Sequence, residues 1–160
     1  MIVKPADWRP CTLELPDLIC NCVRLCEMNK QHLKQSILER LKHSLQALAL
    51  SATDQVAHLP DFVVKTDELV LDFDHWRECA VGNYRSDMTA AQLDSLAAIK
   101  AHIATPNSTG DRTVWDESAL YSHPFWGELR NLAIQSLNAF GWPQETPPSY
   151  AHEYVSGKER

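Results

Sequence analysis

Residues 33–48 read LKQSILERLKHSLQAL, and this stretch decides the fold class of the chain. Its apolar side chains recur every three or four residues, which is the repeat of one face of an α-helix. That face consists of Leu33, Ile37, Leu41, Leu45 and Leu48. Charged side chains such as Glu39 and Arg40 fall off the stripe, as they do in a helix that packs one side against a core. The stretch therefore predicts an amphipathic helix within a helical domain.

A second helical pattern lies directly before this stretch. Its apolar positions are Leu18, Ile19, Cys22, Val23 and Cys26. Pro16 and Asp17 suit the first turn of a helix, because proline needs no backbone N–H partner there and a carboxylate favours the positive end of the helix dipole. Asn29 lies between the two patterns. Periodicity leaves two alternatives open: two helices separated near Asn29, or one long helix.

Two more helices are predicted in the middle of the chain. Residues 68–81 place apolar side chains at helical spacing after a capping Asp67, although the sequence LVLDF within them also alternates like a strand. Thr89 and Gln92 have the spacing of a capping box, so a helix follows them. We expect that helix to end before Pro106.

The last predicted helix has clear boundaries. Ser122 or His123 caps it, Pro124 occupies its first turn and Gly141 stops it. The short piece DESALYS before it is compatible with a helical turn or two.

Two segments between these helices have the composition of connectors. Residues 51–66 lose the helical repeat and contain Pro60, so they predict a connector with a short extended piece at 62–64. Residues 106–110, PNSTG, predict a loop. The fold class is therefore all-α: a compact irregular bundle of five to six helices, with one short strand or hairpin around 60–75 as the open alternative.

The predicted domain organisation is simple. The chain has 160 residues, 44% of them hydrophobic, which is the size and composition of a single globular domain. We expect residues 1–142 to form that domain. Residues 143–160 are rich in proline and are expected to be a flexible C-terminal tail, extended or disordered unless Tyr150 and Tyr154 dock it.

Cysteine count and hydropathy bear on the compartment. The N-terminal residues have no apolar core of an export signal, and no stretch reaches the length of a membrane span. Five cysteines are an odd number, which favours reduced thiols over a disulfide framework. We therefore expect a cytoplasmic protein that does not contact a membrane.

The charge of the chain is acidic and unevenly distributed. The net charge of −6 disfavours direct nucleic-acid binding, which draws on an excess of Lys and Arg. Residues 61–128 contain five basic and twelve acidic residues, so the acidic excess is concentrated there. A plain solvated face is one interpretation. The other is a docking surface for a basic protein, formed by Asp67, Glu68, Asp72, Asp74 and Glu78.

No motif in the sequence indicates a particular reaction, and we expect neither catalysis nor a metal or other cofactor. Two groups keep an alternative open. Asp74, His75 and Glu78 share helix faces and are able to bind a divalent cation or move a proton, as in a metal-binding or hydrolytic enzyme. Cys20, Cys22 and Cys26 are spaced like thiolate ligands, but the apolar stripe on which Cys22 and Cys26 fall favours core packing.

Two segments carry a resemblance to a known class of proteins. They are ELVLDFDHWREC, within residues 67–79, and WDESALYSHPFWGELRNLAIQSLNAFGW, residues 115–142. The chain resembles small acidic bacterial immunity proteins, the cognate inhibitors of polymorphic or contact-dependent toxins. The resemblance implies a non-enzymatic inhibitor that binds a basic toxin domain, for which a nuclease is one candidate. A structural or regulatory interaction module is the other alternative, and the oligomeric state is left open.

Overall fold

The structure is a computed structural model that describes the backbone of residues 15–149 and the side chains of residues 27–149. Within these residues the chain forms six α-helices, two 3-10 turns and no strand. The helices are α1 (Leu15–Ala49), α2 (Ala52–His58), α3 (Lys65–Tyr84), α4 (Ala90–Thr109), α5 (Ala119–Ser122) and α6 (Pro124–Phe140). The all-α prediction is confirmed, and the open alternative of a strand around 60–75 is wrong.

Helix α1 settles the question at Asn29, because it runs without a break through that position. The chain divides into two units, one ending at Leu33 and one beginning at Lys34. The second unit contains the last part of α1 and all the later helices, and the features below belong to it.

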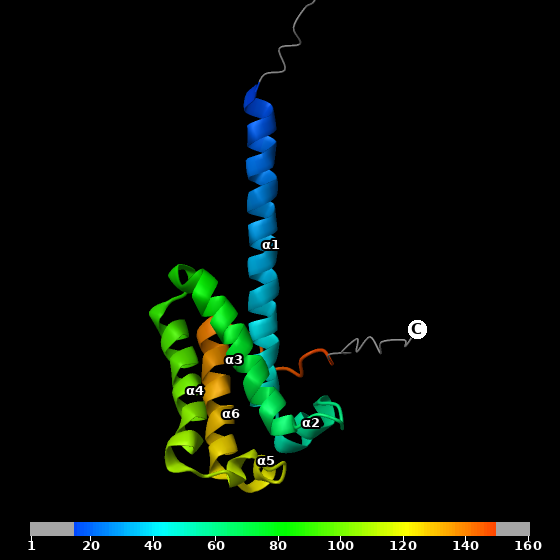
Figure 1. Ribbon diagram of the computed structural model, residues 1–160, viewed down its shortest axis with the longest axis vertical. Coiled ribbons are helices and arrows are strands. Elements are labelled where there is room, and N and C mark those ends of the chain that lie inside the picture. Colours follow the sequence, from blue (N-terminus) through cyan, green and yellow to red (C-terminus); the bar gives the residue numbers. More distant parts are fainter. Residues whose placement is uncertain (1–14, 150–160) are drawn as a thin grey trace, which may run out of the picture. The chain divides into compact units, whose positions relative to one another are not determined.

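The core of this second unit contains the leucine face predicted from 33–48. Leu41, Leu45 and Leu48 are fully buried, whereas Leu33, in the first unit, is 58% exposed. Helices α3, α4 and α6 lie next to one another in Figure 1 and supply most of the remaining core. Their largest buried side chains are Phe73 from α3, Leu96 and Ile99 from α4, and Trp126, Leu129 and Leu137 from α6.

Helix α4 begins as predicted and ends later than predicted. The Thr89 and Gln92 capping box is formed, with each side chain accepting the other residue's backbone N–H. The helix then continues through Pro106 to Thr109 and ends at Gly110, whose φ of 72° is left-handed. Proline has no N–H to donate to the His102 carbonyl, and the Thr105 hydroxyl donates to that carbonyl instead, at 2.7 Å. The predicted end before Pro106 and the predicted loop at 106–110 are therefore wrong.

The predicted connector 51–66 contains a helix. Ser51 caps α2 by accepting the backbone N–H of Asp54 at 3.2 Å. The predicted extended piece at 62–64 is absent, since the chain there turns directly into α3. Asp67 is not the cap of α3: the helix begins at Lys65 after Val64, so Asp67 lies in its first turn.

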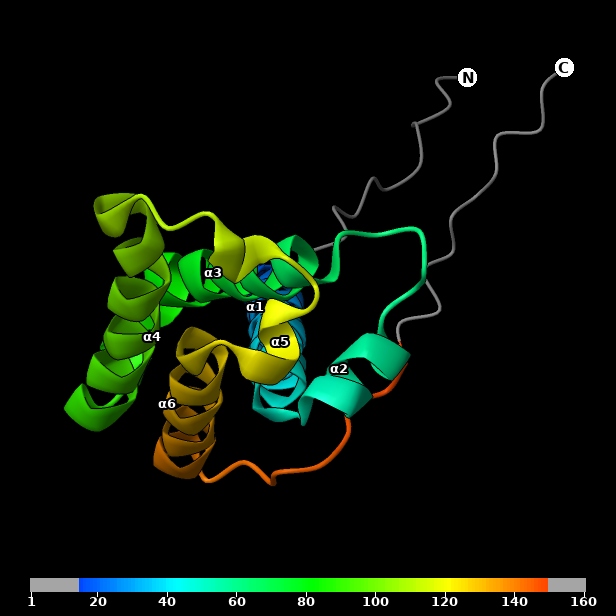
Figure 2. The same cartoon turned by 90° about the horizontal axis from the view of Figure 1, so that it is seen from below.

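Two polar side chains fix α2 against its neighbours. Gln55 donates its amide to the carbonyls of Ala47 and Leu48, at 3.2 and 3.0 Å, which caps the end of α1. Arg130 on α6 donates to the Gln55 side chain at 2.9 Å and to the carbonyls of Leu50 and Leu120 at 3.0 and 2.6 Å. Figure 2 shows α2 and α5 as neighbours. These contacts link α2 to the end of α1 and to α6.

The last helix and the segment after it follow the prediction in part. His123 caps α6, Pro124 begins it and Gly141 ends it with φ 67°. The described residues after it are not helical, but Pro147 is buried and the Pro143 carbonyl accepts from Gln46 at 2.8 Å. Tyr150 and Tyr154 lie outside the described residues, and the domain boundary at 142 stays a prediction. None of the described helices has the combination of length and apolar character that a membrane span requires.

Candidate functional site

Helix α3 carries all five carboxylates of the predicted docking surface, and it places them on two flanks. Asp67, Asp74 and Glu78 recur at helical spacing on one flank. Glu68 and Asp72 are one turn apart on another flank. Each flank borders its own hollow. The first is a groove between α3 and α4, and the second is a pocket between α3, α1 and α2.

The groove has a volume of about 440 Å³ and a largely apolar lining. Its walls are Asp67, Val70, Leu71 and Asp74 from α3, Lys100, Ile103, Ala104 and Asn107 from α4, and Trp115. Leu71 is 64% exposed, and it lies next to the other apolar side chains of the groove. The groove therefore offers apolar contact area together with two carboxylates at its edge.

The charges along the groove are partly neutralised. Lys100 donates to both carboxylate oxygens of Asp74 at 2.6 Å, and Arg77 donates to Asp74 at 3.3 Å and to Glu78 at 3.4 Å. Partial burial raises the pKa of Asp74, but the hydrogen bonds and charges of Lys100 and Arg77 outweigh it, so the pKa lies below its ordinary value. Asp74 is therefore a stabilised charge. Asp67, by contrast, is exposed.

A further acidic cluster lies at the start of α3. The ammonium of Lys65 is buried and lies 3.6 Å from the Asp61 carboxylate and 4.0 Å from that of Glu117. Next to it in sequence, Phe62 and Val64 are 70% and 62% exposed. Exposed apolar side chains thus adjoin carboxylates here as they do along the groove. Sequence reasoning missed Glu117, because nothing local indicates that it meets Lys65 from so far along the chain.

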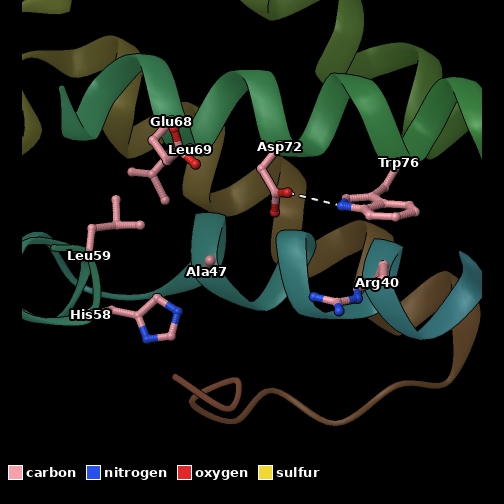
Figure 3. A pocket seen from close by; sticks show the side chains of 8 residues that line it. All are labelled: Arg40, Ala47, His58, Leu59, Glu68, Leu69, Asp72 and Trp76. Atoms are coloured by element: carbon pink, nitrogen blue, oxygen red, sulfur yellow. Dashed lines mark hydrogen bonds between the residues drawn. The ribbon is translucent and has the colours of Figure 1, made fainter. Parts of the chain in front are cut away.

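The pocket on the other flank of α3 has a volume of about 240 Å³. Its walls are Glu68, Leu69, Asp72 and Trp76 from α3, Arg40 and Ala47 from α1, and His58 and Leu59 at the end of α2. Figure 3 shows Arg40 near Trp76 at one end, Glu68 and Leu69 at the other, and Asp72 between them. The Trp76 indole N–H donates to Asp72 at 2.9 Å, and the Arg40 guanidinium lies 5.9 Å from the Trp76 ring centre.

Two titratable groups of the pocket, Asp72 and His58, are shifted towards their neutral forms. Burial raises the pKa of Asp72, and the charge of Glu68 adds to that rise, while the Trp76 hydrogen bond and Arg40 act against it. Burial also lowers the pKa of His58. Binding and catalytic sites typically contain a carboxyl group whose ionised form is disfavoured by burial in a pocket.

The alternative site Asp74, His75 and Glu78 is not assembled as a ligand set. Asp74 pairs with Lys100, Glu78 pairs with Arg77, and the imidazole of His75 lies 3.9 Å from the Cys79 sulfur. In the part of the chain whose side chains are described, no three His, Cys, Asp or Glu residues are placed to hold a metal ion. The Cys20, Cys22 and Cys26 side chains lie outside that part.

The pocket itself was missed by sequence reasoning. One wall had a usable signal, since Glu68, Asp72 and Trp76 recur every four residues and share a helix face. The opposite wall had none, because Arg40 reads as an ordinary solvated residue and His58 lies in a segment without helical repeat. Comparison with family models, with curated proteins and with solved structures finds no match for this chain.

Proposed function

We propose that this chain is a non-enzymatic protein-binding module that takes up a basic and partly apolar segment of a partner protein in the groove between α3 and α4. The observation that carries the proposal is exposed Leu71 beside the apolar groove walls, with carboxylates at the edge. Apolar anchors surrounded by charge are typical of protein interfaces.

The charges around the groove favour a basic partner. Asp67 is exposed at its edge, and Asp61 and Glu117 lie near the start of the same helix. Exposed carboxylates raise the rate of encounter with a cation and disfavour acidic partners. The ion pairs of Asp74 reduce its attraction for a basic partner. We therefore assign the electrostatic steering mainly to Asp67 and the binding affinity mainly to Leu71.

The resemblance to immunity proteins supplies a more specific form of the proposal. In that form the partner is a cognate bacterial toxin domain in the cytoplasm, and a basic nuclease domain would present the cations that the groove accepts. The chain would then inhibit the toxin by covering its active site or a surface beside it.

The groove is tested with two short synthetic helical peptides, one presenting lysines and leucines and one presenting glutamates and leucines. We expect the basic peptide to bind and the acidic one not to bind, as measured by fluorescence anisotropy. Raising the salt concentration from about 50 mM to about 300 mM is expected to slow association, because exposed charges are screened beyond a Debye length. Equal binding of both peptides would contradict the charge assignment.

Three variants locate the binding site. Leu71→Ser is expected to weaken binding of the basic peptide by about tenfold, because roughly one buried aliphatic contact is lost. Asp67→Lys is expected to reduce mainly the association rate. Asp94→Lys is the matched control, since Asp94 is exposed on α4 away from the groove-lining positions. If Asp94→Lys weakens binding as much as Asp67→Lys, the groove is not the site.

The toxin-specific form is tested in cells. The open reading frame adjacent to the gene for this chain is expressed under an inducible promoter, with and without the chain. Growth arrest that the chain relieves, and that Leu71→Ser fails to relieve, is the expected result. An adjacent frame without toxicity would remove this form and leave the groove proposal to the peptide experiment.

A further inference from the structure

The pocket between α1, α2 and α3 lies on the flank of α3 that the proposed protein groove does not use. We propose that this pocket binds a primary ammonium group carried on a short aliphatic chain, with the ammonium between Glu68 and Asp72 and the chain against Ala47, Leu59 and Leu69. The inference does not depend on the groove, because no lining residue is common to the two hollows.

The charge of the lining selects a cation. The side chains that line the pocket include two carboxyl groups, those of Glu68 and Asp72, and one guanidinium, that of Arg40. His58 is neutral near pH 7, because burial lowers its pKa below the ordinary value of 6.5. Counted over the described lining residues, carboxyl groups outnumber the guanidinium by one, an excess that an ammonium ligand balances and a carboxylate ligand would increase.

The positions of these charges give the ligand an orientation. Arg40 lies against Trp76 at one end of the pocket, Glu68 lies at the other end, and Asp72 lies between them, one helical turn from Glu68 on the same wall. The Trp76 indole N–H donates to Asp72 and fixes the direction of that carboxylate. An ammonium group has three donors, enough to bond both carboxylates at once. Two neighbouring carboxylates that repel each other gain most from a cation between them.

The apolar part of the lining sets the size of the ligand. Ala47, Leu59 and Leu69 are all buried and form the inner surface of the pocket. A volume of about 240 Å³ corresponds to about eight groups of the size of a water molecule, at roughly 30 Å³ each. A chain of four to five methylene groups ending in an ammonium fits this space. Both a free alkylamine and the side chain of a lysine residue have that chemistry.

The experiment uses the full chain and n-pentylamine as the probe, with n-pentanol and pentanoate as matched ligands. Binding is followed by the NMR shift of the Trp76 indole N–H, assigned from the peak that disappears in Trp76→Phe. We expect saturable shifts with pentylamine in the millimolar range, as is usual for so small a ligand. Pentanol should bind about tenfold more weakly or worse, and pentanoate should not bind. Equal binding of amine and alcohol, tighter binding of pentanoate, or no saturable shift would each overturn the proposal.

Variants test the two carboxylates separately. Glu68→Gln and Asp72→Asn are each expected to weaken the binding of pentylamine about tenfold. Asp94→Asn, the same kind of substitution on the surface of α4, should leave the affinity unchanged. Thermal unfolding checks that each variant is folded, and Glu68→Gln is the safeguard because Glu68 is only half-buried. Unchanged affinity in both pocket variants would overturn the site.

A last arm distinguishes the two sources of the ammonium group. Acetyl-lysine methylamide presents the same ammonium on a peptide-like backbone. If it binds as tightly as pentylamine, the pocket accepts a lysine side chain. If it binds more than about tenfold more weakly, the pocket is assigned to a free amine. Either result keeps the ammonium site.

Discussion

Asp72 and Asp74 lie two residues apart on α3, and their surroundings act on their charges in opposite directions. Asp74 accepts hydrogen bonds from Lys100 and Arg77, which hold its pKa below the ordinary value in spite of partial burial. Asp72 faces the pocket, where burial and the nearby Glu68 raise its pKa. The ionised form of Asp74 thus stabilises the fold, whereas the ionised form of Asp72 costs stability.

The comparison separates a structural carboxylate from one that is free to serve another purpose. An ion pair that bridges two helices accounts for Asp74 without any ligand. Asp72 accepts one hydrogen bond, from Trp76, yet burial and Glu68 disfavour its ionised form, so its charge contributes less to folding than that of Asp74. Groups that cost stability are found preferentially at functional sites, which agrees with the ammonium site that we propose.

Removing Asp74 is the largest expected perturbation. Asp74→Ala is expected to lower the free energy of unfolding by about 1–2 kcal/mol, because Lys100 and Arg77 lose a half-buried partner. Urea unfolding measures this, and Lys100→Met combined with Asp74→Ala should show a non-additive effect. Asp94→Ala serves as the exposed control. A change no larger than that control would mean that the ion pair contributes nothing to stability.

Neutralising Asp72 is expected to act in the opposite direction. Asp72→Asn retains an oxygen that can accept from Trp76 and removes a disfavoured charge, so stability near pH 7 should rise by about 0.5–1 kcal/mol. Urea unfolding compares it with wild type. A clear loss of stability would show that Arg40 stabilises the ionised carboxylate more than burial penalises it, and the contrast with Asp74 would fail.

Acidification should remove the opposite effects of the Asp72 and Asp74 charges on stability, one after the other. The folded pKa of Asp74 lies below the ordinary value near 3.8, so its contribution is complete above that value and is lost as the pH falls through the lowered pKa. The folded pKa of Asp72 lies above 3.8, so its penalty is complete above the raised pKa and disappears as the pH falls below the ordinary value. The advantage of Asp72→Asn should therefore vanish on acidification before the defect of Asp74→Ala does. Unfolding curves over a pH series test the order.

The smallest expected change concerns the hydrogen bond within the pocket. Trp76→Phe removes the indole N–H that favours ionised Asp72, so the pKa of Asp72 should rise further while that of Asp74 stays the same. Carboxyl carbon chemical shifts followed over pH measure both values in one titration. A fall in the pKa of Asp72 would mean that access of water to the pocket matters more than the lost hydrogen bond.

The predictable part of the fold was the part with local causes. The capping box at Thr89 and the stop at Gly141 were both read correctly, because each depends on residues within a few positions. The continuation of α4 through Pro106 also has a local cause, the hydrogen bond of the Thr105 hydroxyl. The composition of residues 106–110 nevertheless predicts a loop. Helix α2 was missed although Ser51 caps it locally, since the segment lacks a helical repeat and contains Pro60, and the Gln55 side chain finds its partners on α1 and α6.

The candidate site shows the same division. Sequence reasoning located the acidic residues that the structure places on α3, since charge density is a property of sequence. It could not assign Asp67 and Glu68 to different sites. The two residues are adjacent in sequence, yet Asp67 lines the groove and Glu68 lines the pocket. The partners that give Asp72 and Asp74 opposite pKa shifts include Arg40 and Lys100, which come from other helices.

Gln55 has a consequence for the motions of the molecule. Helix α2 has seven residues, too few to persist in water alone, and the Gln55 side chain links it at once to the end of α1 and to Arg130. Its opening is therefore a local unfolding event that breaks the hydrogen bonds of this glutamine. His58 and Leu59 at the end of α2 form one wall of the pocket, so each such opening also removes that wall. The exchange rate of the α2 amides with deuterium then sets an upper limit on how long a ligand stays enclosed.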